Sequence, residues 1–138
     1  QSFLFNKTLS LAYEFEEELF LPIIDDVCFD KNSILGKFEN EPTQKLAIPL
    51  VGHSYYKKSR FDYYIKKILE DELLSPKDFF IKDFQEISIE GGFRNASINY
   101  LNFGINENLV KFQLSRGSYA TIMLREIIKP KNPLVCGF

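Results

Sequence analysis

The sequence changes from a strand-like to a helical pattern at residues 117 and 118, and this change strongly constrains the fold of the C-terminal part. Residues 109–114 alternate apolar and polar side chains, as a half-buried strand does. Residues 118–129 repeat apolar side chains at helical spacing until Pro130 stops the pattern. Gly117 can adopt backbone conformations closed to other residues, and Ser118 is a good N-cap. Such a turn presents free backbone N–H groups to an anion.

Two more segments have the apolar spacing of a helix. They are residues 2–19, with Pro22 as the stop signal, and residues 60–74. The first residue is Gln1 rather than Met, and nothing caps the first helix, so we expect this helix to begin earlier in a longer chain. Ser75 followed by Pro76 predicts the start of a short further helical turn.

The remaining segments read as short strands and turns. Pro49 argues that its segment is an edge or an extended stretch rather than a central strand. Gly91 and Gly92 form a connection, and residues 102–108 read as a turn-rich loop. The class is therefore predicted to be α+β, a mostly antiparallel sheet with packed helices. Residues 23–24 and 27–29 are short apolar runs within strand-and-turn material, residues 34–38 form a possible second strand, and residues 46–51 are the apolar segment that contains Pro49. The predicted strands of the second half are residues 85–90, 93–101 and 109–114.

Composition limits the possible functions. The chain has 138 residues, 45% of them apolar, and a net charge of −2, so it can form a core but lacks the charge of a protein that coats nucleic acid. Cys28, Cys136 and the single histidine, His53, do not have metal-site spacing, so no metal or cofactor is predicted. No run of about 18 apolar residues exists, so no membrane partner is predicted. We expect an intracellular, cytoplasmic protein, with an organellar (mitochondrial) location as the alternative.

One string is far more specific than these patterns. Residues 117–121 read Gly-Ser-Tyr-Ala-Thr, and residues 124–126 read Leu-Arg-Glu. This string resembles the C-terminal signature of the TruD family of RNA pseudouridine synthases. Three further strings resemble segments of the same family, closest to its archaeal and eukaryotic branches, in the same order and spacing. These are residues 1–6 (Gln-Ser-Phe-Leu-Phe-Asn), 48–52 (Ile-Pro-Leu-Val-Gly) and 91–94 (Gly-Gly-Phe-Arg).

The sequence departs from the family pattern at a few places. Ser115 and Arg116 stand where the family usually carries Leu-Pro-Lys or a similar string, and His53 stands where tyrosine is common. The resemblance implies a division into residues 1–20, a helix of the catalytic domain; 21–84, a reduced insertion domain; and 85–138, the C-terminal strands and helix of the catalytic domain.

The resemblance implies a cofactor-free conversion of uridine to pseudouridine in tRNA or another RNA such as rRNA. In this family an aspartate from a Gly-x-Lys-Asp-type motif and an aromatic residue that stacks on the target base both precede the first helix of this chain. None of the aspartates present lies in such a motif, so no catalytic residue is predicted within these 138 residues. The chain alone is predicted to be inactive, and an upstream segment or a second polypeptide is expected to carry the aspartate.

The resemblance also selects candidate residues for the wall of the active site and for RNA binding. Gly117, Ser118 and Thr121 would shape the pocket wall and offer N–H groups, and Tyr119 would pack under the catalytic loop. Arg125 would pair with a carboxylate or phosphate, or else with the adjacent Glu126.

Two more arginines are candidates for contact with the RNA. Arg116 is the best exposed phosphate candidate by position, and Arg94 would either contact the RNA backbone or be an ordinary surface residue. His53 as a general base and the many aromatic residues as a stacking platform are the less favoured interpretations.

Two alternatives to an enzyme remain. The chain could be a non-catalytic, TruD-derived RNA-binding structural subunit of a ribonucleoprotein such as an organellar ribosome. It could also be an unrelated α+β interaction domain.

Overall fold

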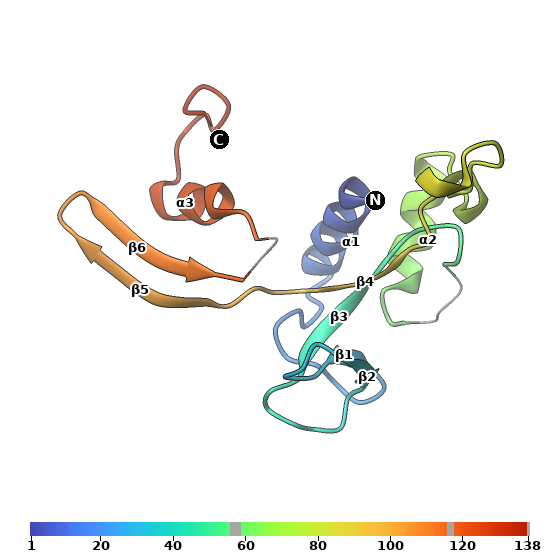
Figure 1. Ribbon diagram of the computed structural model, residues 1–138, viewed down its shortest axis with the longest axis horizontal. Helices are drawn as coiled ribbons and strands as arrows, with labels where there is room; N and C mark the ends of the chain where they lie inside the picture. The colour runs from blue at the N-terminus through green and yellow to red at the C-terminus, as the bar shows by residue number, and fades with distance from the viewer. Residues whose placement is uncertain (56–58, 116–117, 138) are drawn as a thin grey trace. The chain divides into compact units, whose positions relative to one another are not determined.

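Two groups of helices and strands make up the structure, and each has its own internal contacts. The structure is a computed structural model that describes residues 1–55, 59–115 and 118–137. Unit 1 comprises Gln1–Ser97 and unit 2 comprises Ile98–Phe138 (Figure 1).

Unit 1 combines an antiparallel sheet with helices. The strands pair in the order β2-β1-β3-β4. The elements of unit 1 are α1 (Ser2–Glu14), β1 (Val27–Phe29), β2 (Leu35–Lys37), β3 (Lys45–Leu50), α2 (Asp62–Asp71), 3₁₀ turns at Pro76–Phe79 and Gln85–Ile87, and β4 (Gly92–Asn95).

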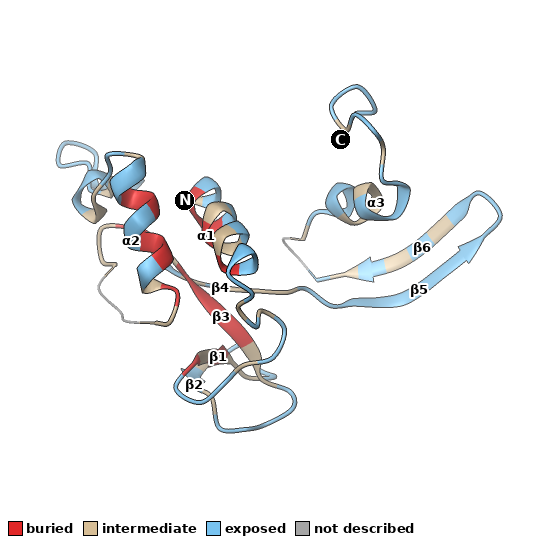
Figure 2. Cartoon of the chain, turned by 180° about the vertical axis from the view of Figure 1, so that it is seen from behind, coloured by how far each residue is buried: buried red, intermediate tan, exposed pale blue. Residues whose placement is uncertain are grey.

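The core of unit 1 forms where α1, α2 and β3 meet. Figure 2 shows the buried residues on these three elements, and α1 contacts both α2 and β3. Phe61, Ile48 and Ile65 are among the largest fully buried side chains. Removing each from water contributes about 1.5–3 kcal/mol. The cluster consists of Leu4, Phe5, Ala12, Leu46, Ile48, Val51, Phe61, Tyr64, Ile65, Ile68 and Leu69.

The first helix ends earlier than its apolar spacing predicts. Glu16 adopts a left-handed conformation with φ of 59°. Its N–H donates to the Tyr13 carbonyl at 3.0 Å, and the Glu17 N–H donates to the Ala12 carbonyl at 2.9 Å. This is the Schellman ending, usually formed by glycine. The prediction of a helix to residue 19 was therefore wrong, because a glutamate takes the glycine conformation well before Pro22.

The second helix and the turn after it agree with the sequence patterns. α2 covers Asp62–Asp71 within the predicted range of 60–74. The following 3₁₀ turn has Ser75 at its N-cap and Pro76 at its first position. The Asp78 carboxylate accepts a hydrogen bond from the Ser75 N–H at 2.6 Å, completing a capping box. The serine–proline start signal is confirmed.

Pro49 lies in a central strand, contrary to the prediction. β3 is flanked by β1 and β4, but β1 pairs only with Lys45 and Leu46. The Ala96 N–H donates to the Leu46 carbonyl, so the alternation along the ladder puts Pro49 at a non-hydrogen-bonded position toward β4. A backbone N–H at this position would point toward β1, but β1 does not extend alongside Pro49. The absence of an N–H in proline therefore removes no hydrogen bond from the sheet.

The predicted strands between residues 85 and 101 are also wrong in part. Residues 85–87 form a 3₁₀ turn, in which the Ile87 N–H donates to the Phe84 carbonyl at 3.1 Å. The run 93–101 divides into β4 and β5 (Tyr100–Asn106). β5 includes most of the predicted loop, because a register shift between Leu101 and Gly104 accommodates the left-handed Asn102.

Unit 2 consists of a hairpin and one helix with no core of its own among the described residues. β5 pairs antiparallel with β6 (Leu109–Leu114), and α3 (Ala120–Ile128) follows. Within 98–115 and 118–137, no residue is buried (Figure 2). Large apolar side chains remain exposed, including Leu101, Ile105, Leu109, Ile122 and Ile128.

Helices and antiparallel sheets together confirm the predicted α+β class. None of the helices in the described part of the chain has the length and apolar character of a membrane span. Within the same residues, no three His, Cys, Asp or Glu side chains converge as metal ligands would. Cys28 is buried, Cys136 is exposed, and both are unpaired.

Candidate functional site

The signature string lies at the junction between β6 and α3 in unit 2. The Ser118 N–H donates to the Ser115 carbonyl at 3.1 Å, and the two hydroxyl oxygens of these serines are 3.0 Å apart. These contacts join the residue that follows β6 to the residue that precedes the N-cap of α3. Arg116 and Gly117, both predicted as site residues, lie outside the described residues.

Ser118 is not the N-cap of α3, so that prediction was wrong. The N-cap is Tyr119, with an extended backbone at φ −102° and ψ 108°. Its carbonyl accepts a hydrogen bond from the Ile122 N–H at 3.2 Å. The Ser118 hydroxyl pairs with Ser115 instead of capping the helix, so the helix starts one residue later than predicted.

Tyr119 and Thr121 lie at the exposed start of α3. Tyr119 is 75% exposed, and Thr121 is exposed as well. The first turn of α3 contains no acidic residue that would neutralise the partial positive charge of the helix N-terminus. The junction can therefore accept an anion such as a phosphate through backbone N–H groups.

Arg125 lies further along the same helix. Its Nη2 is 3.5 Å from Glu126 Oε1, and both side chains are substantially exposed, at 40% and 65%. A pair at this distance in water contributes little stability. The guanidinium thus forms the expected pair with Glu126 but is held only weakly.

Arg94 belongs to unit 1, whereas the other candidates belong to unit 2. Its guanidinium carbon is 5.1 Å from the centre of the Phe5 ring in α1, which is cation–π range. Arg94 is exposed on β4. In this structure it is a surface arginine that lies over an aromatic ring of the core cluster.

An ion-pair network in unit 1 was not foreseen from the sequence. Arg60 Nε is 2.9 Å from Asp26 Oδ1, and Arg60 Nη1 also pairs with Glu17. Glu17 further accepts a hydrogen bond from the Tyr64 hydroxyl at 2.9 Å. Burial and this hydrogen bond raise the pKa of Tyr64. The network ties the segment after α1 to the start of α2, and no local spacing could reveal it because its members are 34 to 47 positions apart.

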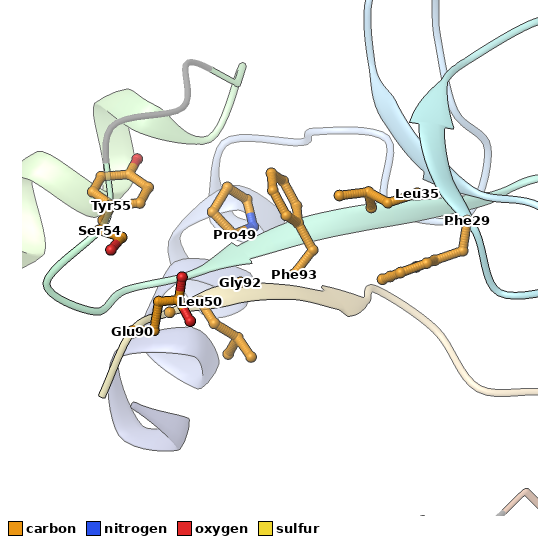
Figure 3. A pocket seen from close by; sticks show the side chains of 10 residues that line it. Phe29, Leu35, Pro49, Leu50, Ser54, Tyr55, Glu90, Gly92 and Phe93 are labelled. Carbon is orange, nitrogen blue, oxygen red and sulfur yellow. The ribbon is translucent and has the colours of Figure 1, made fainter. Parts of the chain in front are cut away.

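A second feature that the sequence did not reveal is a cavity of about 280 Å³ on the sheet of unit 1. Figure 3 shows Phe29, Leu35, Pro49 and Phe93 gathered along the strands, with Tyr55 and Glu90 at the other end. The Tyr55 hydroxyl donates to Asp62, and burial together with this bond raises the pKa of Tyr55.

The buried thiol of Cys28 is unreactive near neutral pH. Burial raises the pKa of Cys28 to about 11, and the nearby Asp26 carboxylate adds to the shift. Since the thiolate is the nucleophile, Cys28 offers no reactive group near neutral pH.

Several aspartates form ion pairs or hydrogen bonds that stabilise the fold. Asp26 binds Arg60, Asp62 binds Lys66, and Asp78 forms the capping box. Asp30 accepts hydrogen bonds from the N–H groups of Asn32 and Ile34. Unit 2, which carries the signature, contains no aspartate in its sequence.

Comparison with known proteins assigns the family. The family model described as tRNA pseudouridine synthase D (TruD) matches residues 1–127. The chain belongs to the TruD family. The match spans both units of the TruD chain and includes the signature at the start of α3, which confirms the resemblance seen in the sequence.

Archaeal relatives cover much of this TruD chain. Proteins named "Probable tRNA pseudouridine synthase D" from Pyrobaculum islandicum and Picrophilus torridus are 30% and 33% identical over 142 and 150 residues, covering 100% and 94% of the chain. The crystal structure of a TruD protein from Methanosarcina mazei aligns with a TM-score of 0.73 and 25% identity over 96% of the chain.

The TruD chain described here spans about a third of the length of these relatives. It covers 34% of the Pyrobaculum islandicum protein, 36% of the Picrophilus torridus protein and 37% of the Methanosarcina mazei chain.

Proposed function

We propose that this chain is the C-terminal portion of an RNA pseudouridine synthase that converts uridine to pseudouridine in tRNA or another RNA, with the catalytic aspartate outside these 138 residues. The observation that carries the proposal is the TruD match over residues 1–127, which includes the signature at the β6–α3 junction.

The reaction is an isomerisation that needs no cofactor. The bond between ribose C1′ and uracil N1 breaks, the base turns, and C1′ bonds to C5 instead. C5 loses its proton and N1 gains one, so atoms and charge balance. The base must be exposed before reaction, which costs a few kcal/mol of stacking that pocket contacts must offset.

Within this scheme the β6–α3 junction supplies contacts rather than the nucleophile. The N-terminus of α3 offers N–H groups to a phosphate or to an active-site carboxylate. Arg125, paired only weakly with Glu126, is available to form a bidentate contact with either group. The Tyr119 side chain is exposed at the start of the same helix, and in this proposal it packs under the catalytic loop.

The exposed apolar residues of unit 2 support the proposal that additional polypeptide packs against it. A hairpin and a helix with no buried residue in 98–115 and 118–137 do not form a stable fold alone. The curated relatives are about three times as long as this chain. An upstream segment or a second polypeptide that carries the aspartate would cover these side chains and complete the active site at once.

Nucleoside analysis of RNA tests the proposal. Unmodified tRNA transcripts are incubated with the chain alone, with the aspartate-bearing polypeptide alone, and with both. Pseudouridine should form only with both. Full modification by the chain alone would contradict the proposal. Stable binding of one RNA at fixed stoichiometry without modification under every condition would instead support the non-catalytic structural subunit.

A further inference from the structure

The chain between α1 and β1 exposes large apolar side chains at its surface. Residues 13–26, which we call the acidic–apolar segment, are mostly exposed (Figure 2). Phe20 is 73% exposed and Ile24 is 85% exposed. Grouped apolar side chains on a surface mark interaction sites. The exposed apolar residues of the segment are Tyr13, Phe15, Phe20, Leu21, Ile23 and Ile24.

Hydrogen bonds hold the backbone of this segment in place. Arg60 donates to the Glu18 carbonyl oxygen and, through Nε, to Asp26 Oδ1 at 2.9 Å. The Glu18 carboxylate accepts a hydrogen bond from the Phe20 N–H at 2.8 Å. The second oxygen of Asp26, Oδ2, accepts one from the Ile23 N–H at 2.8 Å. A surface segment that is already ordered loses little conformational entropy when it binds a partner.

Two exposed aromatic rings extend this surface to the start of α2. The ring centre of Phe15 lies 5.8 Å from that of Tyr64, which in turn lies 5.5 Å from that of Tyr63. Tyr64 is buried, whereas Phe15 and Tyr63 are exposed on either side of it in these contacts. Aromatic side chains are frequent anchors of protein interfaces.

The charge of the segment selects the kind of partner. Residues 13–26 contain six acidic residues and no lysine or arginine. Arg60 pairs with two of the six. An RNA phosphate would meet like charge at this surface, whereas lysine and arginine side chains would meet opposite charge. The acidic residues that are exposed and form no ion pair within the described part of the chain are Glu14, Glu16 and Asp25.

We infer that the acidic–apolar segment, together with Tyr63, binds a basic amphipathic polypeptide segment outside these 138 residues. The apolar side chains of that partner pack on Phe20 and Ile24, and its lysines and arginines lie against the exposed carboxylates. The inference goes beyond the proposed function, because it assigns a contact surface to unit 1 and does not require that the partner carry the catalytic aspartate.

Titration of the full 138-residue chain with synthetic peptides tests this surface. The probes are a helical peptide of about 14 residues built from leucine and lysine, and its counterpart with glutamate in place of lysine. NMR signals of Phe15, Phe20 and Ile24 are followed. The lysine peptide should shift these signals and bind about tenfold or more tightly than the glutamate peptide, with an affinity that falls as salt is raised. Oligouridylate, added separately as the RNA probe, should leave the signals unchanged.

Two variants with matched controls locate the contacts. Ile24→Ser should weaken binding of the lysine peptide about tenfold, whereas Leu73→Ser, at an exposed position two residues after α2, should not. Glu14→Lys should weaken binding by a similar factor. Glu86→Lys, which makes the same change in net charge outside the segment, should leave the affinity nearly unchanged. All four positions are exposed, and circular dichroism checks that each variant is folded.

Three results would overturn the inference. The first is equal binding of the lysine and glutamate peptides, or no shift of the Phe20 and Ile24 signals with either. The second is an equal loss of affinity in Glu14→Lys and Glu86→Lys, which would reflect net charge alone. The third is a shift of these signals by oligouridylate, which would make the surface a nucleic-acid contact. Pseudouridine formation by the assembled protein is measured separately, so the proposed function and this inference can fail independently.

Discussion

Arg125 makes only a weak contact within the described part of the chain. Its contact with Glu126 at 3.5 Å is long, exposed and between sequence neighbours. Such a pair contributes almost nothing to folding. Under the proposed function, the Arg125 guanidinium binds a group that lies outside the described residues.

We expect Arg125→Gln to leave thermal stability unchanged while it lowers pseudouridine formation by the assembled protein about tenfold or more, because a charged hydrogen bond of about 1.5–3 kcal/mol is lost. Melting temperature and initial rate are measured on the same preparation. Glu126→Gln is the control and should retain the rate. An unchanged rate for Arg125→Gln would remove this residue from the site.

Gly52 shows a different constraint, the close approach of two backbones. A Cβ at Gly52 would lie 2.2 Å from the Gly91 nitrogen and 2.3 Å from the Glu90 carbonyl carbon. Gly91 in turn has a φ of 100°, a conformation that favours glycine. Two strings that the sequence marked as family-like, at residues 48–52 and 91–94, are thus neighbours in space.

We expect Gly52→Ala to lower the free energy of unfolding by about 3 kcal/mol or more, because backbone atoms rather than flexible side chains must move. Urea denaturation followed by circular dichroism measures it. Gly36→Ala is the control, since a Cβ at that position of β2 meets nothing within 4 Å. Equal midpoints for the two variants would contradict the close approach.

At the scale of elements, the end of α1 and the start of α2 depend on each other. The early Schellman ending at Glu16 leaves Glu17 outside the helix, where it reaches Arg60 and Tyr64. Arg60 also holds Asp26, which is only 5% exposed. A carboxylate that is this buried needs its cationic partner.

We expect Arg60→Met to destabilise unit 1 by about 3 kcal/mol, because the Asp26 carboxylate is left buried without its cation. Chemical denaturation at pH 7 measures the loss. Lys66→Met removes the exposed partner of Asp62 on α2 and should change the midpoint by no more than experimental error. Equal effects of the two variants would show that Asp26 is well solvated after all.

The helices and strands also differ in how well the sequence predicts them. Periodicity found α2 and α3 and the β6 strand, because each satisfies its own local pattern. It failed at α1, where a glutamate takes a glycine conformation, and at Pro49, whose position in the ladder depends on where β1 stops pairing. It also failed at residues 85–90, where the alternation of Ile87 and Ile89 is typical of a strand but residues 85–87 form a 3₁₀ turn. In the site, it misplaced the N-cap because Ser118 bonds Ser115 instead.

At the scale of the whole molecule, the two units differ in what stabilises them. Unit 1 has a core, an ion network and paired strands. Unit 2 has a paired hairpin, but no buried side chain among its described residues. Its stability must therefore come from burial of these side chains against groups outside unit 2.

We expect hydrogen exchange to separate the units. In the isolated chain, amides of α1, α2 and β3 should exchange slowly, whereas those of β5, β6 and α3 should exchange at close to unprotected rates. Addition of the aspartate-bearing polypeptide should slow exchange in the second set by about a hundredfold or more. Strong protection of the hairpin in the isolated chain would argue that unit 2 is stable without a partner.

We propose that this chain completes a pseudouridine synthase whose catalytic aspartate lies outside these 138 residues. Tritium release from tRNA labelled at uridine C5 tests it most directly, because C5 loses its hydrogen only when the new bond forms. We predict release by the assembled protein, and background levels for the chain alone and after the partner's catalytic aspartate is changed to asparagine. Full release by the chain alone, or by the asparagine variant, would contradict the account.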